Sequence, residues 1–179
     1  MTNRDDGQMG FEAEGSTQQL GDPLALESQI CFALAVASRG VIGAYRSVLE
    51  PIHLTHPQYL VMLALWQHEK LTMREIANLL RLEPATVTPL VKRLEALDYV
   101  TKTRSVRDER IVEVTLTSRG AQLRGAAESI PGLMMDKLGM DVDGVRQLHS
   151  VMQQIIANVD AAAAETSPAR IRSSSDETR

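Results

Sequence analysis

Cys31 is the only cysteine among the 179 residues of this chain, and its thiol is the side chain best suited to covalent chemistry. A thiol that loses its proton can attack an oxidant or bind a metal ion. No disulfide can form within a chain that has one cysteine, so oxidation would end in a mixed disulfide with a small thiol, a sulfenamide or over-oxidation. In a reducing compartment, however, a lone cysteine is most often a small buried hydrophobe. A redox role for Cys31 therefore needs further evidence.

The other polar residues form no pattern typical of an enzyme or a metal site. Cys31, His53, His56 and His68 match no closed zinc spacing. The sequence also has no glycine-rich phosphate loop, nucleophile elbow or aspartate cluster. We therefore expect no enzymatic activity, no cofactor and no metal. A metal-dependent regulator and a thiol peroxidase remain as alternatives, which metal content and steady peroxide consumption would test.

A second group of residues could bind nucleic acid without any covalent step. From Lys70 to Arg110 nine lysines and arginines stand against six acidic residues, although the whole chain has a formal net charge of −4. Hydroxyl and methyl groups suit base edges, and basic groups suit phosphates. The candidate DNA-binding residues are Thr86, Thr88, Pro89, Lys92, Arg93, Arg104, Arg107, Asp108 and Arg110. Any one of them alone would more often be a solvated surface residue, but their joint placement favours DNA, with Asp108 orienting an arginine for a minor groove.

The elements that must position these residues follow one another along the chain. Thr72 and Glu75 form a capping box in front of a short helix. Pro84 begins a second helix, whose apolar positions leave the hydroxyl and basic residues on the opposite surface. Two strand-like runs, 99–104 and 110–117, come next and are joined by a charged tip. Helix, turn, helix and hairpin predict a winged helix-turn-helix.

Longer helices are expected on both sides of this region, at 24–49, 57–68, 117–130 and 141–164. The first is apolar on two faces and so needs two partners, and the last carries an apolar stripe that is most simply a packing face. Because the two flank the DNA-binding region, they predict a homodimer interface. The fold class is therefore mainly α with a small β-hairpin wing. We expect dimerisation helices at 24–56 and 118–164 around a DNA-binding core at 57–117, together forming one domain at 24–164. Residues 1–23 and 165–179 have the composition of disordered tails.

Four segments together resemble the MarR family of dimeric bacterial transcription regulators, and within it the organic-hydroperoxide-resistance (OhrR-type) repressors. They are QICFALAVASR, YRSVLEPIHLTHPQYLVMLALW, LTMREIANLLRLEPATVTPLVKRLE and RDERIVEVTLTSRG. The resemblance covers about half of the chain. It implies a cytoplasmic homodimeric repressor that binds double-stranded operator DNA and is released when an organic hydroperoxide oxidises one cysteine.

The same resemblance implies that Cys31 is the peroxide sensor and that phenolic side chains hydrogen-bond to it. Tyr45 stands at one matching position, whereas His56 replaces the tyrosine of the family motif LTYPQY and Ala35 replaces another. An imidazolium at His56 could lower the thiol pKa, or His56 could be only an exposed residue at a helix start. Tyr45 follows Cys31 by fourteen residues, about 21 Å along a straight helix. If the two touch, Tyr45 must therefore come from the partner subunit.

Two further expectations concern ligands and membranes. A MarR-type repressor released by a small phenolic or aromatic ligand, with Cys31 inert, is the main alternative to the redox mechanism. No apolar run approaches the roughly 18 residues of a membrane span, and the N-terminal region is acidic and polar. We therefore expect a cytoplasmic protein that does not interact with a membrane.

Overall fold

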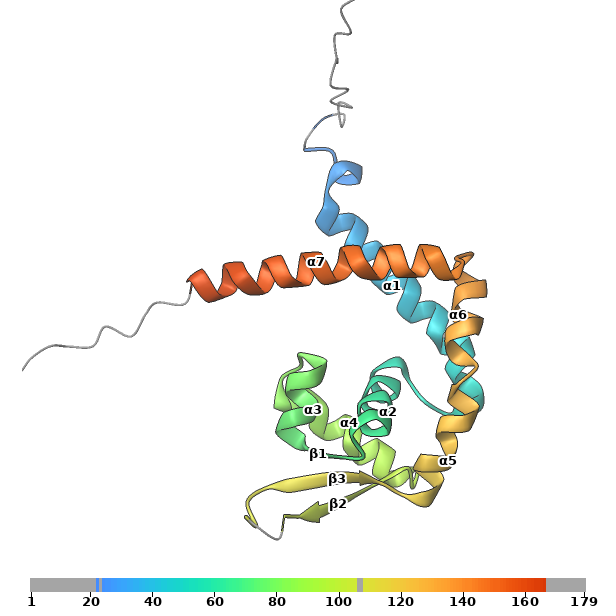
Figure 1. Cartoon of the computed structure of the whole chain (residues 1–179), viewed down its shortest axis with the longest axis vertical. Helices are drawn as coiled ribbons and strands as arrows, with labels where there is room; N and C mark the ends of the chain where they lie inside the picture. The colour runs from blue at the N-terminus through green and yellow to red at the C-terminus, as the bar shows by residue number, and fades with distance from the viewer. Residues whose placement is uncertain (1–21, 23, 106–107, 167–179) are drawn as a thin grey trace, which may run out of the picture. The chain divides into compact units, whose positions relative to one another are not determined.

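The computed structural model describes residues 22, 24–105 and 108–166. By its contacts the chain divides into two compact units, 1–40 and 41–179. Figure 1 shows helices throughout and a small sheet. The described elements are η1 Leu26–Ser28, α1 Ile30–Leu49, η2 Glu50–Ile52, α2 His56–His68, β1 Lys70–Thr72, α3 Met73–Leu80, α4 Pro84–Ala96, β2 Val100–Arg104, β3 Val112–Leu116, α5 Ser118–Ala127, α6 Ile130–Leu138 and α7 Val142–Thr166.

Helix α1 begins later than the sequence suggested. The 3-10 turn η1 comes first, and Gln29 then adopts an extended backbone with φ −83° and ψ 118°. This extended residue interrupts the expected helix from residue 24, so that α1 starts at Ile30. The side chains of Ile30 and Val36 remain 69% and 44% exposed.

The segment Ile30–Ile52, which comprises α1 and η2, is long and apolar enough to cross a membrane by length and composition alone. Its mean hydropathy is 1.2, and it lies near the N-terminus. The sequence expectation of no membrane span rested on the shortness of its uncharged runs, and Arg39 and Arg46 do interrupt this segment. Charges inside a bilayer are costly, so the length test by itself does not assign the segment to a membrane.

The core of the second unit lies around α2, α3, α4 and the sheet. On α4 the buried side chains lie on the apolar face that the sequence indicates. The fully buried side chains of the core are Leu49, Val61, Met62, Leu65, Ile76, Val87, Val91, Leu94, Val100 and Val114. Burying one such side chain contributes about 1.5–3 kcal/mol. The capping box at Thr72 is present, since Thr72 N–H donates to Glu75 Oε2 at 2.7 Å and Glu75 N–H donates to Thr72 Oγ1 at 3.2 Å. The predicted helix-turn-helix is thereby confirmed.

The wing is a three-stranded antiparallel sheet in the order β1-β3-β2. Strands β2 and β3 confirm the predicted hairpin and are shorter at their ends than the predicted runs. Strand β1 was not foreseen, because Lys70–Thr72 is too short to show alternation. Its pairing places Leu71 opposite the fully buried Val114, and Lys70 Nζ forms an ion pair with Glu113 at 3.2 Å. The DNA-binding core therefore includes the short segment that leads into α3.

Helix α5 begins where the wing ends and is attached to the core at Gly120. Gly120 N–H donates to Thr117 Oγ1 at 3.0 Å, and Gly120 O accepts from Trp66 Nε1 at 2.9 Å. A Cβ at this glycine would overlap the carbonyl oxygen of Tyr99. The helix expected at 117–130 ends at Ala127, and a separate helix, α6, begins at Ile130 with Pro131 in its first turn.

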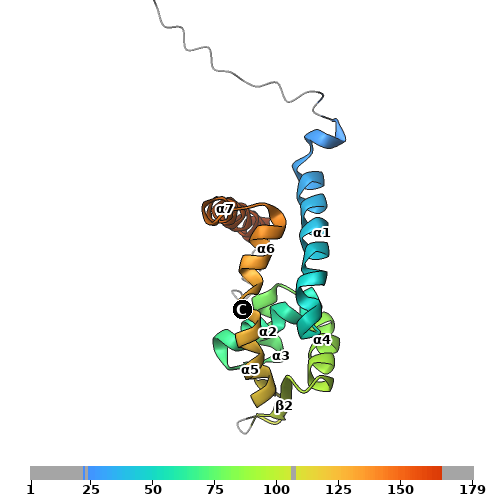
Figure 2. The ribbon, with the colours of Figure 1, turned by 90° about the vertical axis from the view of Figure 1, so that its right-hand side faces the viewer.

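Helix α6 leads from α5 to α7 (Figure 2). Within the described residues α7 buries none of its side chains, although an apolar stripe follows its length. Leu148, Val151 and Val159 are 48%, 51% and 62% exposed. The sequence indicated a packing face here, and within one chain these three residues of that face stay about half exposed or more.

Candidate DNA-binding surface and redox site

Helix α4 presents its predicted DNA-contacting residues to solvent. Pro84 occupies the first turn behind the N-cap Glu83, and Val87, Val91 and Leu94 form the buried face. The opposite face is exposed and carries Thr86, Thr88, Pro89, Lys92 and Arg93. This is the surface that a helix must offer to enter a major groove.

Two residues of that face have local backbone effects. Pro89 lies inside α4, and the helix continues through it to Ala96. Because proline has no N–H, the carbonyl of Ala85 lacks its usual helical donor. Thr88 Oγ1 donates to the carbonyl of Pro84 at 3.2 Å. To donate a hydrogen bond to a base, the hydroxyl must break this bond with Pro84. To accept one from a base, it can keep the bond and use its oxygen lone pairs.

The wing residues lie at the tip of the hairpin, where β2 ends and β3 begins. Arg104 ends β2 opposite Val112, and both Arg104 and Arg110 are exposed. Asp108 Oδ1 accepts from the backbone N–H of Arg110 at 2.9 Å. The carboxylate thus shapes the turn, and its predicted role in orienting a guanidinium stays a prediction. Arg107 lies outside the described residues.

Cys31 lies in the first turn of α1, and its side chain is exposed. A buried structural cysteine would have no access to an oxidant, so this position meets one requirement of a redox sensor. In the described structure the core-residue interpretation of Cys31 does not hold.

Tyr45 and His56, the other two predicted sensor residues, lie against each other. Their ring centroids are 4.9 Å apart, and Tyr45 is also 5.9 Å from the ring of Tyr59. Tyr59 in turn meets Trp66 edge-on at 6.3 Å. Tyr45, His56, Tyr59 and Trp66 thus form an aromatic cluster. The sequence did not identify Tyr59 and Trp66 as members, because only the packing of α1 against α2 brings the four rings together.

Burial sets the protonation states in the aromatic cluster. It raises the pKa of Tyr45 above the ordinary value, and it raises that of Tyr59, to which the Coulombic effect of Tyr45 adds. Burial also lowers the pKa of His56. His56 is therefore a half-buried neutral imidazole near pH 7. Partial burial argues against the water-exposed interpretation, and the lowered pKa favours the neutral imidazole over the imidazolium.

We predict that His56 makes the fold less stable in acid. Because its pKa is lowered in the folded state, the unfolded chain binds a proton first as the pH falls. The free energy of unfolding should therefore decrease from about pH 7.5 to about pH 5.5. Urea unfolding of His56→Asn should show a smaller decrease over this range. His149→Asn, at an exposed position on α7, is the control. An equal slope in the wild type and His56→Asn would contradict this role.

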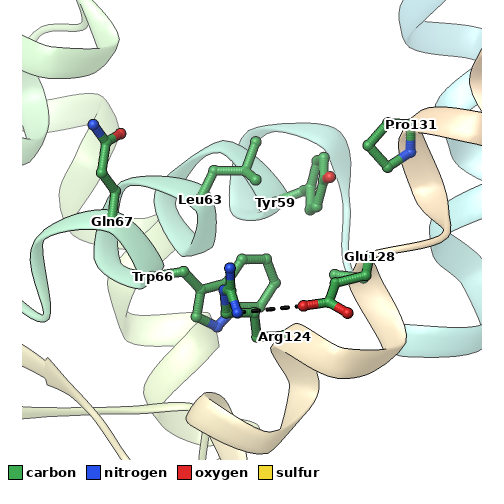
Figure 3. Close-up of a pocket in the computed structure, with 8 residues that line it drawn as sticks. Tyr59, Leu63, Trp66, Gln67, Arg124, Glu128 and Pro131 are labelled. Atoms are coloured by element: carbon green, nitrogen blue, oxygen red, sulfur yellow. Dashed lines mark hydrogen bonds and ion pairs between the residues drawn. The ribbon is translucent and has the colours of Figure 1, made fainter.

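A cavity of about 460 Å³ lies between α2 and the α5–α6 segment (Figure 3). Its walls are Tyr59, Leu63, Trp66, Gln67, Arg124, Ala127, Glu128 and Pro131. Arg124 Nη1 forms an ion pair with Glu128 at 3.3 Å. Leu63 is 41% exposed and lines this cavity. Sequence periodicity could not find the cavity, because its two walls lie about 60 residues apart.

Comparison with known proteins agrees with this geometry. The SarA/Rot family of transcriptional regulators matches residues 44–125. Over 135 residues the chain is 37% identical to the organic hydroperoxide resistance transcriptional regulator of Bacillus subtilis, covering 75% of this chain and 92% of that protein. Over 127 residues it is 44% identical to the HTH-type transcriptional regulator TtmR of Methylorubrum extorquens, covering 71% of this chain and 65% of TtmR, slightly less than two thirds of that relative.

Among solved structures, reduced AbfR bound to DNA is 28% identical with a TM-score of 0.68, covering 77% of this chain and 94% of AbfR. The recognition helix, the wing and these relatives define a winged helix-turn-helix regulator. The chain belongs to the MarR family of transcriptional regulators, in the group that includes the organic hydroperoxide resistance regulator. It is a DNA-binding transcriptional regulator.

Proposed function

We propose that the protein is a homodimeric repressor whose operator binding is released when an organic hydroperoxide oxidises Cys31. The observation that carries this proposal is the exposed thiol of the only cysteine, in the first turn of α1. The relative in Bacillus subtilis, named for organic hydroperoxide resistance, supports the choice of oxidant. The protein acts in the cytoplasm and by binding, without enzymatic turnover.

The oxidation step is a two-electron transfer. The Cys31 thiolate attacks one peroxide oxygen, the O–O bond breaks, and the other oxygen leaves with a proton as an alcohol. The sulfur becomes a sulfenic acid, which a small cellular thiol converts to a mixed disulfide with loss of water. Tyr45 and His56 are neutral near pH 7, so they assist by donating hydrogen bonds to the thiolate and supply no positive charge.

A second copy of the chain completes this site. Tyr45 follows Cys31 by fourteen residues on the helix α1, so the phenol that meets Cys31 comes from the partner subunit. Exposed apolar side chains on α1 and α7, such as Ile30 and Val159, provide surface for that second copy to cover. Oxidation at the dimer interface then changes the spacing of the two α4 helices.

Operator binding under oxidation tests the proposal. We would measure binding to the DNA upstream of the protein's own gene, before and after a near-stoichiometric organic hydroperoxide, and again after dithiothreitol. Loss of binding that dithiothreitol reverses is the expected result. Binding that is indifferent to peroxide would overturn the redox mechanism and leave DNA binding itself intact.

Arg110→Ala tests the wing. Its guanidinium is exposed at the hairpin end, so its loss should weaken operator binding about tenfold with little change in the free energy of unfolding. Arg146→Ala removes the same charge from α7 and serves as the control in a fluorescence anisotropy titration. If the two variants bound the operator with equal affinity, Arg110 would not contact DNA.

A second candidate function is release by a small aromatic ligand, with Cys31 inert. The observation in its favour is the cavity of about 460 Å³ beside Tyr59, Trp66 and Arg124, a size within the range of about 300–1,000 Å³ typical of ligand sites. Titration with 4-hydroxybenzoate, followed by the fluorescence of Trp66, would test it. A Cys31→Ser protein that leaves DNA on adding this probe would favour the second candidate.

A further inference from the structure

The turn between α3 and α4 is joined to α7 by a two-pronged ion pair. Arg81 Nη1 lies 2.7 Å from Asp160 Oδ1, and Arg81 Nη2 lies 2.8 Å from Asp160 Oδ2. The two residues are 79 positions apart in the sequence. Two parallel N–H···O bonds fix direction as well as distance, because the planar guanidinium matches the carboxylate. Both side chains are more than half exposed, so their attraction is open to screening by salt.

Arg81 occupies a backbone position that ordinarily suits glycine. It is the C-cap of α3, with φ 52° and ψ 43° in the left-handed region, and its N–H bonds to the carbonyls of Ala77 and Asn78. A residue with a Cβ pays a conformational cost there that glycine avoids. A positive φ by itself does not single out Arg81, since it also occurs at His53, Glu69 and Asp98. The role of Arg81 therefore rests on its ion pair, and glycine is the substitution that removes the side chain without straining this backbone.

The Arg81–Asp160 ion pair fixes the position of helix α7 against the DNA-binding core. Within the described residues none of the side chains of α7 is fully buried, and Val145, Met152 and Ile155 are only partly buried, so apolar packing in one chain constrains its direction weakly. The Arg81–Asp160 pair holds its C-terminal half to the turn, and α4 begins at Pro84, three residues after Arg81. A displacement of α7 is therefore transmitted to the start of the helix that carries Thr86 and Lys92.

We propose that the Arg81–Asp160 pair sets the angle of the DNA-binding core against α7 and thereby selects the spacing of operator half-sites. Arg81 and Asp160 are positioning residues, which act through α4 and do not themselves bind DNA. The inference rests on the proposed dimer, in which α7 lies at the interface and the two α4 helices bind half-sites about one helical turn apart. It adds a determinant of target selection that lies outside the DNA-contacting surface.

Three variants test the inference: Arg81→Gly, Asp160→Ala and the exchanged pair Arg81→Asp with Asp160→Arg. Glycine suits the left-handed backbone, so Arg81→Gly should fold at least as well as the wild type. The affinities to measure are those for the footprinted operator and for versions with one base pair added to or removed from the spacer. Arg146→Ala, which breaks the exposed pair with Asp143 inside α7, is the matched control.

Either single substitution should weaken binding to the native spacing about two- to fivefold and reduce discrimination against the altered spacers, as loss of an exposed ion pair implies. The exchanged pair should restore both. If Arg81→Gly weakened operator binding and Asp160→Ala did not, Arg81 would contact DNA directly, and the inference would be overturned. Unchanged spacing preference in both single variants would also overturn it. If the wild type fails to bind any operator, the proposed function fails instead.

Discussion

Cys31→Ser is expected to bind the operator as tightly as the reduced wild type and to remain bound when an organic hydroperoxide is added. Serine keeps the size and exposure of the side chain, so α1 and the DNA-binding core should be unaffected. Its hydroxyl is not a nucleophile at neutral pH and cannot form the sulfenic acid. The protein should therefore lose its entire response to peroxide, which fluorescence anisotropy of labelled operator would measure.

The control for this experiment is Tyr45→Phe, which keeps the ring packed against His56 and removes the phenolic donor. It should slow the release by peroxide without abolishing it. Normal release of Cys31→Ser would contradict the thiol switch. If dithiothreitol failed to reverse that release, oxidation of one of the eight methionines would be the alternative cause.

Gly120→Ala is expected to destabilise the fold by about 2–4 kcal/mol, the combined cost of overpacking and of a lost buried hydrogen bond. The added Cβ would overlap the carbonyl oxygen of Tyr99, a backbone atom that cannot rotate away. Any shift of Gly120 also disturbs the bond from Trp66 Nε1 to its carbonyl. Urea unfolding monitored by the fluorescence of Trp66, the only tryptophan, would measure the loss directly.

Gly125→Ala is the matched control, because it lies in the same helix and a Cβ there meets no atom within 4 Å. Alanine is the better helix former by about 1 kcal/mol, so this variant should be slightly stabilised. Equal effects of the two substitutions would show that the close approach of α5 to Tyr99 does not limit stability.

The winged helix-turn-helix could be predicted because its signals are local. The capping box at Thr72 and Glu75, the proline at the start of α4 and the alternation around Val114 each act within a few residues. Backbone hydrogen bonding and side-chain periodicity decide these features before any long-range contact forms. The start of α1 was predicted too early, because the η1 turn and the extended Gln29 leave no strong local signal in the sequence.

The candidate site was predicted only in part. The types and positions of Cys31, Tyr45 and His56 identified a sensor by resemblance, but the charge on His56 depends on burial that no local pattern records. The turn geometry gives the Asp108 carboxylate the Arg110 N–H, a backbone contact that the sequence did not indicate, and the expectation that Asp108 orients a guanidinium stays a prediction.

The sequence by itself determined the class of this protein: the helix-turn-helix, the wing, the exposed face of α4 and the single thiol. Tertiary structure alone decided which rings surround Tyr45, where the cavity beside Trp66 opens, and that Arg81 meets Asp160. The physical reason is the range of the interactions. Caps and periodic faces are fixed by neighbours within one or two turns, whereas ring contacts, cavities and ion pairs between distant residues exist only after separate helices have packed.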